Sequence, residues 1–198
     1  MVVRVRRTAA VPDEPVTPVV LALGSDLGDR AGHLRGAVAA LAAVPGLTLT
    51  AVSPVVESAP VRLPGHEPAE DEQRFLNAVA LGTTALAPRA VLAACQAVED
   101  AAGRVRRERW GPRTLDVDVV DLGGVVDTGD EALLLPHPRA HERAFVLVPW
   151  ALADPGAALA GAGGGSVGEL AARLLAADPA ALQVRPDVVL TLPDEAAP

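Results

Sequence analysis

The sequence predicts an α+β fold, in which one antiparallel sheet has helices packed on it. Two features of the 198-residue chain indicate this class. Short apolar or alternating stretches, typical of strands, are separated by two stretches whose apolar residues recur at helical spacing. Their order along the chain is strand, helix, strand, strand, helix, strand. That order fits a split βαβ arrangement, and we expect the helices to back the sheet on one face.

The first half of the chain supplies a strand, a helix and a second strand. Residues 19–23 form a short apolar run that fits a buried strand, and residues 24–29 are typical of a turn. Ser25 or Asp29 can cap the helix that follows, because both side chains accept hydrogen bonds from backbone N–H groups of a first helical turn. Residues 47–56 alternate in polarity, which predicts the second strand.

The second half completes the pattern. Residues 57–73 are rich in proline and acidic residues, which predicts a long loop. Residues 75–83 again fit a strand, and residues 88–103 fit a helix that begins at a proline and ends at a glycine. Residues 115–119 alternate between apolar and acidic side chains and predict another strand, and helical turns are expected over residues 139–151.

We divide the chain into three parts: a flexible N-terminal extension over residues 1–17, a main domain over residues 18–156, and a C-terminal tail over residues 157–198. In the tail, residues 161–165 are glycine-rich and predict a flexible linker. The spacing of Ser166 and Glu169 is that of a capping box, so a short amphipathic helix is expected to follow.

Composition excludes several classes of protein. The formal net charge is −8, which argues against general binding of nucleic acid or of anionic membranes. All 17 basic residues are arginine, so neither a P-loop lysine nor a Schiff-base lysine is available. The single cysteine, Cys95, cannot form an internal disulfide. No apolar run reaches the roughly 18 residues of a membrane span, and we expect a cytoplasmic protein.

An acidic pair follows a cluster of arginines. Asp116 and Asp118 are two residues apart on the predicted strand, so both carboxylates project from one face, about 7 Å apart. At an effective dielectric constant near 20 they repel each other by about 2 kcal/mol, which a divalent cation can remove. The cluster just upstream holds five arginines within ten residues: Arg104, Arg106, Arg107, Arg109 and Arg113. Guanidinium groups beside carboxylates suit a polyphosphate that enters with magnesium.

The stretch Arg109 to Asp118 (RWGPRTLDVD) resembles the signature of the 6-hydroxymethyl-7,8-dihydropterin pyrophosphokinases, a family of folate-biosynthesis enzymes. Further similar pieces occur in the same order as in that family, and the resemblance covers roughly residues 18–156. These pieces are residues 23–28, residues 75–78, Glu99 with Gly103 and Arg104, residues 136–138, and Arg143 with Phe145.

The resemblance implies a ferredoxin-like βαββαβ sandwich and transfer of pyrophosphate from ATP to 6-hydroxymethyl-7,8-dihydropterin, with release of AMP. It implies that Asp116 and Asp118 hold two Mg²⁺ ions with ATP, and that Arg104 and Arg113 join them in catalysis. ATP would be bound by Gln96, Glu99, Arg104, Arg106, Trp110, Arg113, His137 and Arg143. The pterin would be bound by Ser58, Ala59, Pro60, Val61, Phe75, Asn77, Asp116 and Phe145. We expect a monomer that binds no nucleic acid and no membrane.

Other interpretations stay open at this stage. An alternating Asp/Val strand is often merely half solvated, and both phenylalanines could be core residues. Gln96 and Glu99, three apart on a helix, could be polar surface. The chain could also be a non-catalytic ligand-binding module, or a different magnesium-dependent transferase or nucleotide hydrolase.

Overall fold

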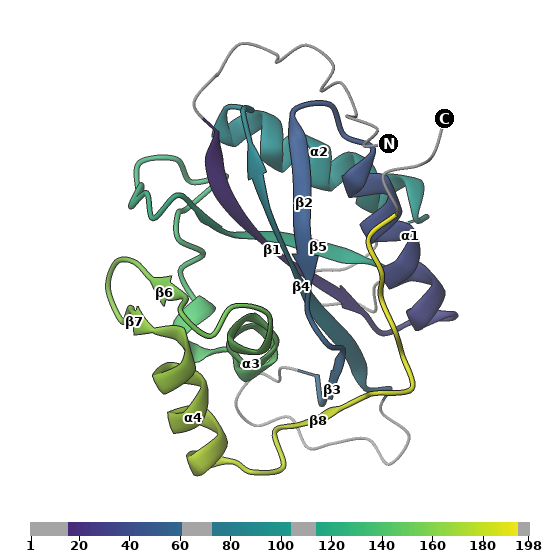
Figure 1. Ribbon diagram of the computed structural model, residues 1–198, viewed down its shortest axis with the longest axis vertical. Helices are drawn as coiled ribbons and strands as arrows, with labels where there is room; N and C mark the ends of the chain where they lie inside the picture. The colour runs from purple at the N-terminus through teal and green to yellow at the C-terminus, as the bar shows by residue number, and fades with distance from the viewer. Residues whose placement is uncertain (1–15, 61–72, 104–113, 194–198) are drawn as a thin grey trace, which may run out of the picture.

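The computed structural model describes residues 16–60, 73–103 and 114–193 (Figure 1). In chain order the elements are β1 (Thr17–Ser25), α1 (Arg30–Ala42), β2 (Leu47–Val52), β3 (Val56–Ser58), β4 (Phe75–Thr84), α2 (Pro88–Ala101), β5 (Asp116–Leu122), the 3₁₀ turn η1 (Ala140–Glu142), α3 (Ala144–Ala153), β6 (Ala158–Leu159), β7 (Gly165–Ser166), α4 (Val167–Ala177) and β8 (Leu182–Val184). The N-terminal extension predicted over residues 1–17 lies almost entirely outside the described residues.

The main sheet has six antiparallel strands in the order β5-β1-β4-β3-β8, with β2 also paired to β4. β4 is long enough to pair with β2 along one half and with β3 along the other. Within it, β5, β1, β4 and β2 with their two helices reproduce the predicted βαββαβ order. The α+β class, with a sheet and packed helices, is therefore confirmed.

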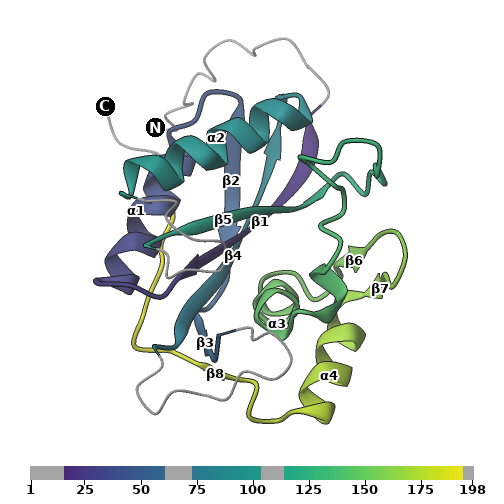
Figure 2. The same cartoon turned by 180° about the vertical axis from the view of Figure 1, so that it is seen from behind.

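Helices cover both faces of the sheet, whereas the sequence predicted one (Figures 1 and 2). Successive side chains of a strand point to opposite faces. Leu21 and Leu23 of β1 accordingly pack in a core with α1 and α2, while Val20 of the same strand packs in a second core with α3 and α4. The second layer was missed because α3 is apolar all round, a pattern that gives no preferred face.

The local signals that begin and end helices were predicted well. The Asp29 carboxylate caps α1 by accepting a hydrogen bond from the Gly32 N–H at 2.9 Å. Pro88 lies in the first turn of α2, and Gly103 follows its end at φ +77°. In the tail, Ser166 Oγ accepts from the Glu169 N–H and begins α4.

Three details differ from the sequence prediction. The strand expected over residues 47–56 is broken, because Pro54 has no N–H to donate and Ser53 instead bonds to Val79 of β4. β3 then begins at Val56, the last residue of the predicted strand, and extends into the stretch expected to be one long loop. The glycine-rich residues 161–165 were expected as a linker, but residues 161–164 turn between β6 and β7, and Gly165 begins β7. None of the helices in the described ranges combines the length and the apolar character that a membrane span requires.

Candidate active site

One row of residues crosses four strands on the α3 face of the sheet. Asp116 of β5 lies opposite Gly24 of β1, Gly24 lies opposite Asn77 of β4, and Asn77 lies opposite Val56 of β3. Residues directly opposite each other in a sheet point to the same face, with Cβ atoms about 5 Å apart. Asp118, two residues along β5, points to that same face. The register of β5 therefore agrees with the prediction that both carboxylates point to the same face of the sheet.

Gly24 leaves the middle of this row open. A Cβ added at Gly24 would lie 3.3 Å from Asn77 Oδ1 and 4.0 Å from Phe75 Cδ1. Because Gly24 lies inside a regular strand, its value here is the missing side chain rather than an unusual backbone angle. A flat group can therefore approach the backbone of β1 between an acidic side chain, an amide and an aromatic ring.

The Asn77 amide has a fixed orientation. Its Nδ2 donates to Ser58 Oγ at 3.0 Å and to the Phe75 carbonyl at 3.4 Å. Both Asn77 and Ser58 are buried, at 5% and 4% exposure. The amide nitrogen is thereby held on the β3 side, so that Oδ1 is left on the Gly24 side as a hydrogen-bond acceptor.

A second group of side chains surrounds Asp118. Arg143, which precedes α3, donates from Nη1 to Asp118 Oδ2 at 2.9 Å. His137 Nε2 lies 3.8 Å from the same oxygen. The Arg143 guanidinium carbon is 5.7 Å from the centre of the Phe145 ring, which is within cation–π range. Residues 137–145 thus bring a cation, an imidazole and an aromatic ring to the acidic end of the row.

The electrostatics of His137 favour its neutral form. Burial lowers the pKa of His137 below its usual 6.5, the charge of Arg143 lowers it further, and Asp118 acts in the opposite direction. His137 Nδ1 accepts a hydrogen bond from the Arg139 N–H at 3.1 Å. The neutral ring therefore carries its proton on Nε2, as a donor directed toward Asp118.

The residues present fit magnesium that enters with a phosphate ligand. Asp116 and Asp118 are both partly exposed. Within the described ranges, no group of three or more His, Cys, Asp or Glu side chains could hold a metal by itself. Mg²⁺ is commonly held by one or two carboxylates, with substrate phosphates and water completing the octahedron. The Nε of Arg143 is buried and has no hydrogen-bond partner among the described residues, so it is one donor that a phosphate oxygen could use.

The predicted aromatic residues lie on the expected face. Phe75 of β4 shares a face with Asn77, two residues along the strand, and Phe145 is the second residue of α3, which packs on that face. Both rings are partly exposed, whereas Trp150 is buried at 3% exposure. Phe145 also packs against the core formed with α3 and α4, so its role in binding a ligand stays a prediction.

Glu99 and Gln96 lie elsewhere. Glu99 is 3% exposed, and its Oε1 accepts a hydrogen bond from the Val117 N–H at 2.8 Å, between the two aspartates along β5. Gln96 is exposed on α2, which covers the other face of the sheet. Ala59 is exposed and Pro60 partly buried, just after β3. The remaining predicted residues lie outside the described ranges: Val61, Arg104, Arg106, Arg107, Arg109, Trp110 and Arg113.

Gly24 was not predicted as a site residue, although a signal was available. An isolated glycine within an apolar strand pattern often marks a place where a ligand or another backbone approaches closely. Residues 19–25 showed that pattern, with a glycine next to the end.

Comparisons with known proteins show the family to which the chain belongs. A family model described as 7,8-dihydro-6-hydroxymethylpterin-pyrophosphokinase (HPPK) matches residues 20–155. The chain is 42% identical over 168 residues to a 2-amino-4-hydroxy-6-hydroxymethyldihydropteridine pyrophosphokinase of Methylorubrum extorquens, covering 85% of this chain and 98% of the relative. It is 44% identical over 131 residues to the protein of the same name from Bacillus subtilis, covering 66% of this chain and 74% of the relative.

The fold is similar to solved structures of Plasmodium falciparum HPPK-DHPS. The wild-type protein with SDX-DHP matches with a TM-score of 0.61 and 11% sequence identity, over 84% of this chain and 46% of that one. The A437G variant with pteroate matches with a TM-score of 0.62 and 10% identity, over 84% and 42%. This chain spans less than half the length of those solved chains, and at such identities the similarity concerns the fold alone.

Proposed function

Since the chain belongs to the 7,8-dihydro-6-hydroxymethylpterin-pyrophosphokinase family, we propose that it transfers a pyrophosphoryl group from ATP to 6-hydroxymethyl-7,8-dihydropterin in folate biosynthesis. The single observation that supports this best is the row of Asp116, Gly24 and Asn77. On one face of the sheet, the row combines an acidic group, a glycine without a side chain over which a ligand can lie, and an amide oxygen that can accept a hydrogen bond. We also propose that the protein acts as a monomer in the cytoplasm, where a lone cysteine stays reduced.

The pterin would lie flat over Gly24. In this position its ring stacks against Phe75, with Phe145 on the other side, and a ring N–H donates to Asn77 Oδ1. Ser58 holds the Asn77 amide in the orientation that makes Oδ1 the acceptor. Backbone groups of residues 58–61 would bind the remaining edge of the ring.

ATP would bind next to the pterin, with its phosphates near the acidic pair. Asp116 and Asp118 would hold Mg²⁺, which when bound neutralises phosphate charge and favours attack at phosphorus. Arg143 is well placed to exchange Asp118 Oδ2 for a phosphate oxygen, and the Nε2–H of neutral His137 is a second donor. The family resemblance adds Gln96, Glu99, Arg104, Arg106, Trp110 and Arg113 to the nucleotide side of the site.

In the transfer, the hydroxymethyl oxygen forms a bond to the β-phosphorus of ATP. The bond from that phosphorus to the oxygen bridging the α- and β-phosphates breaks, and AMP leaves with the bridging oxygen. The hydroxyl proton passes to solvent. The protein mainly positions the two substrates in line and balances charge, as in other phosphoryl transfers.

Product analysis tests the proposal. The chain is incubated with ATP and magnesium, with and without hydroxymethyl-dihydropterin, and nucleotides are separated. We expect AMP only when the pterin is present. ADP, or hydrolysis that does not need the pterin, would instead favour a different nucleotide-using enzyme.

Asp116→Asn separates catalysis from binding. We expect turnover to be lost while pterin binding is largely kept, because the substitution removes a charge but retains the shape. If the protein were a ligand-binding module without catalysis, the wild-type chain itself would bind pterin but form no AMP.

A further inference from the structure

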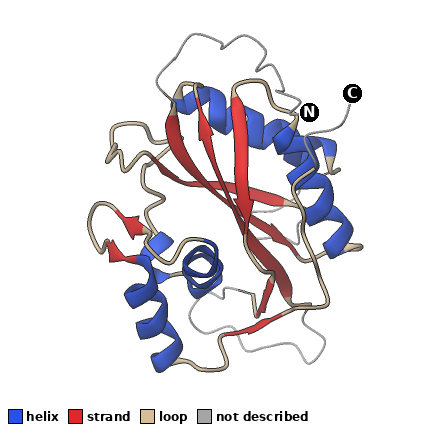
Figure 3. Ribbon diagram, viewed as in Figure 1, coloured by secondary structure: helices blue, strands red, loops and turns tan. Residues whose placement is uncertain are grey.

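The C-terminal segment adds a strand to the main sheet. Residues 182–192 lie beyond the family match, which ends at residue 155. β8 pairs with β3 at the end of the main sheet (Figure 3). The pairing places Leu182 opposite Ser58 and Val184 opposite Val56. β3 has only three residues, so without β8 it would be a short edge strand with its outer backbone groups unpaired.

An ion cluster fastens this segment to β3. Arg185 Nη1 lies 3.0 Å from Glu57 Oε1, and the Arg185 N–H donates to the Val55 carbonyl at 2.8 Å. Arg30, at the start of α1, donates to the same Glu57 oxygen at 2.9 Å and also to the carbonyl of Arg74. The Glu57 carboxylate is therefore shared by arginines from two distant parts of the chain.

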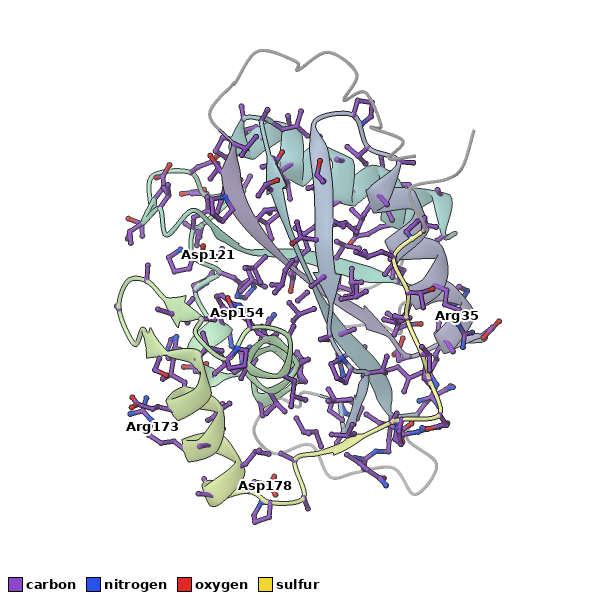
Figure 4. All side chains as sticks on the ribbon, in the orientation of Figure 1. Arg35, Asp121, Asp154, Arg173 and Asp178 are labelled. Carbon is purple, nitrogen blue, oxygen red and sulfur yellow. The ribbon has the colours of Figure 1, made fainter. Side chains whose placement is uncertain are left out.

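Beyond the cluster, the segment runs along α1. Val188 is buried at 9% exposure in the same core as α1, and Leu190 and Leu192 pack against that core. Arg35 of α1 donates from Nε to the Val189 carbonyl at 3.3 Å, and Figure 4 labels Arg35 on the side of the molecule along which this segment passes. These contacts hold the segment in place on the face opposite to the candidate site.

Glu57 and Ser58 are neighbours on β3 whose side chains point to opposite faces. Glu57 faces the ion cluster, and Ser58 Oγ accepts the hydrogen bond that orients the Asn77 amide. A continuous series of contacts thus leads from Arg185 through β3 to Asn77 Oδ1. We propose that residues 182–192, anchored by Arg185, are a positioning element for the pterin side of the active site. This rests on the proposed function.

Arg185→Ala tests the proposal through a split between kinetic constants. We expect the KM and Kd for hydroxymethyl-dihydropterin to rise by about fivefold or more, roughly the effect of losing one good hydrogen bond. The KM for ATP and kcat should stay close to the wild-type values, because the contacts of Asp118 and Arg143 do not involve β3. Arg185→Lys, which keeps the charge, should restore part of the pterin affinity.

Arg89→Ala is the matched control. Arg89 also forms an ion pair, donating from Nη2 to Asp130 Oδ1 at 2.7 Å, but it lies on α2 and is 67% exposed. It makes no described contact with β3 or β8. Its removal should leave both KM values unchanged. Glu57→Gln, which weakens both arginine contacts at once, provides a second variant with the same expected outcome as Arg185→Ala.

Amide hydrogen exchange gives a readout that needs no substrate. In Arg185→Ala, the amides of residues 55–58 should exchange faster than in the wild type and in Arg89→Ala, while those of β1 and β5 should not change. Unchanged exchange at β3 would overturn the proposal. A general defect, in which kcat and thermal stability fall while the KM values for both substrates rise to a similar extent, would also overturn it. If the wild type neither binds nor turns over the pterin, the proposed function fails, and the exchange result still decides whether the segment positions β3.

Discussion

Gly24→Ala is the substitution that most directly tests where the pterin binds. The new methyl carbon would lie 3.3 Å from Asn77 Oδ1 and 4.0 Å from Phe75 Cδ1. The strand itself should accept alanine, since β1 keeps its hydrogen bonds to β4 and β5 at this position. Glycine within a strand costs about 0.5–1 kcal/mol relative to alanine, whereas the 3.3 Å approach requires the Asn77 side chain to shift by a few tenths of an ångström, so the two effects on the free energy of unfolding oppose each other.

The expected loss of function is much larger. The methyl group projects from the backbone by about 1.5 Å, the length of one carbon–carbon bond. A ring in van der Waals contact with Gly24 must move by a comparable distance, away from the Asn77 acceptor and the attacking geometry. A misplacement of about 1 Å can lower a rate by about 100-fold. Overpacking by one methyl group commonly costs about 1–3 kcal/mol, which corresponds to a 5- to 150-fold loss of affinity.

The assay compares pterin Kd, kcat/KM and urea unfolding for the wild type, Gly24→Ala and Gly36→Ala. The control is on α1, where an added Cβ would meet nothing within 4 Å. Gly36→Ala should raise stability by up to about 1 kcal/mol and leave the pterin affinity unchanged. Wild-type pterin affinity in a folded Gly24→Ala protein would refute the reasoning, because a ring lying over that position could not tolerate the methyl group.

Two further predictions concern the aromatic and imidazole groups of the site. Phe75→Ala should weaken pterin binding by about 1–3 kcal/mol, by analogy with the stacking of nucleobases on aromatic side chains, and an unchanged Kd by titration would return Phe75 to a purely structural role. The pKa of His137 is lowered in the folded protein, mainly by burial and then by Arg143. Below about pH 6.5 the unfolded chain therefore takes up a proton at His137 that the folded protein does not. Stability should therefore fall as the pH drops from 6.5 toward the native pKa, and urea unfolding at about pH 7.5 and about pH 5.5 should show a smaller loss for His137→Gln than for the wild type.

Local sequence signals predicted much of the fold and of the site. The alternation over residues 115–119 placed both aspartates on one face, and the register of β5 against β1 confirms it. Caps and breakers such as Asp29 and Pro88 are local as well, since their effect depends on a few neighbouring residues. The βαββαβ order followed from periodicity alone.

Long-range pairing explains what was missed. β3 and β8 have three residues each, too few for a periodic pattern, and each is defined by a partner far along the chain. The sequence does contain a signal for the second helical layer. α3 is apolar on all sides, which is stable only if a further element covers the face turned away from the sheet. The apolar stripe of α4, predicted from the tail, is that cover.

Glu99 shows how local sequence signals and long-range contacts combine at the site. From the sequence it was a polar helical residue that the family resemblance assigned to the nucleotide. In the structure its carboxylate is buried and accepts a hydrogen bond from the backbone of Val117, between the two aspartates. This hydrogen bond pairs a backbone N–H of β5 that lies between Asp116 and Asp118, and it stabilises the strand there. The common face of the acidic pair thus follows from the alternation in the sequence, whereas the contact from α2 that supports this part of β5 is encoded by no local pattern.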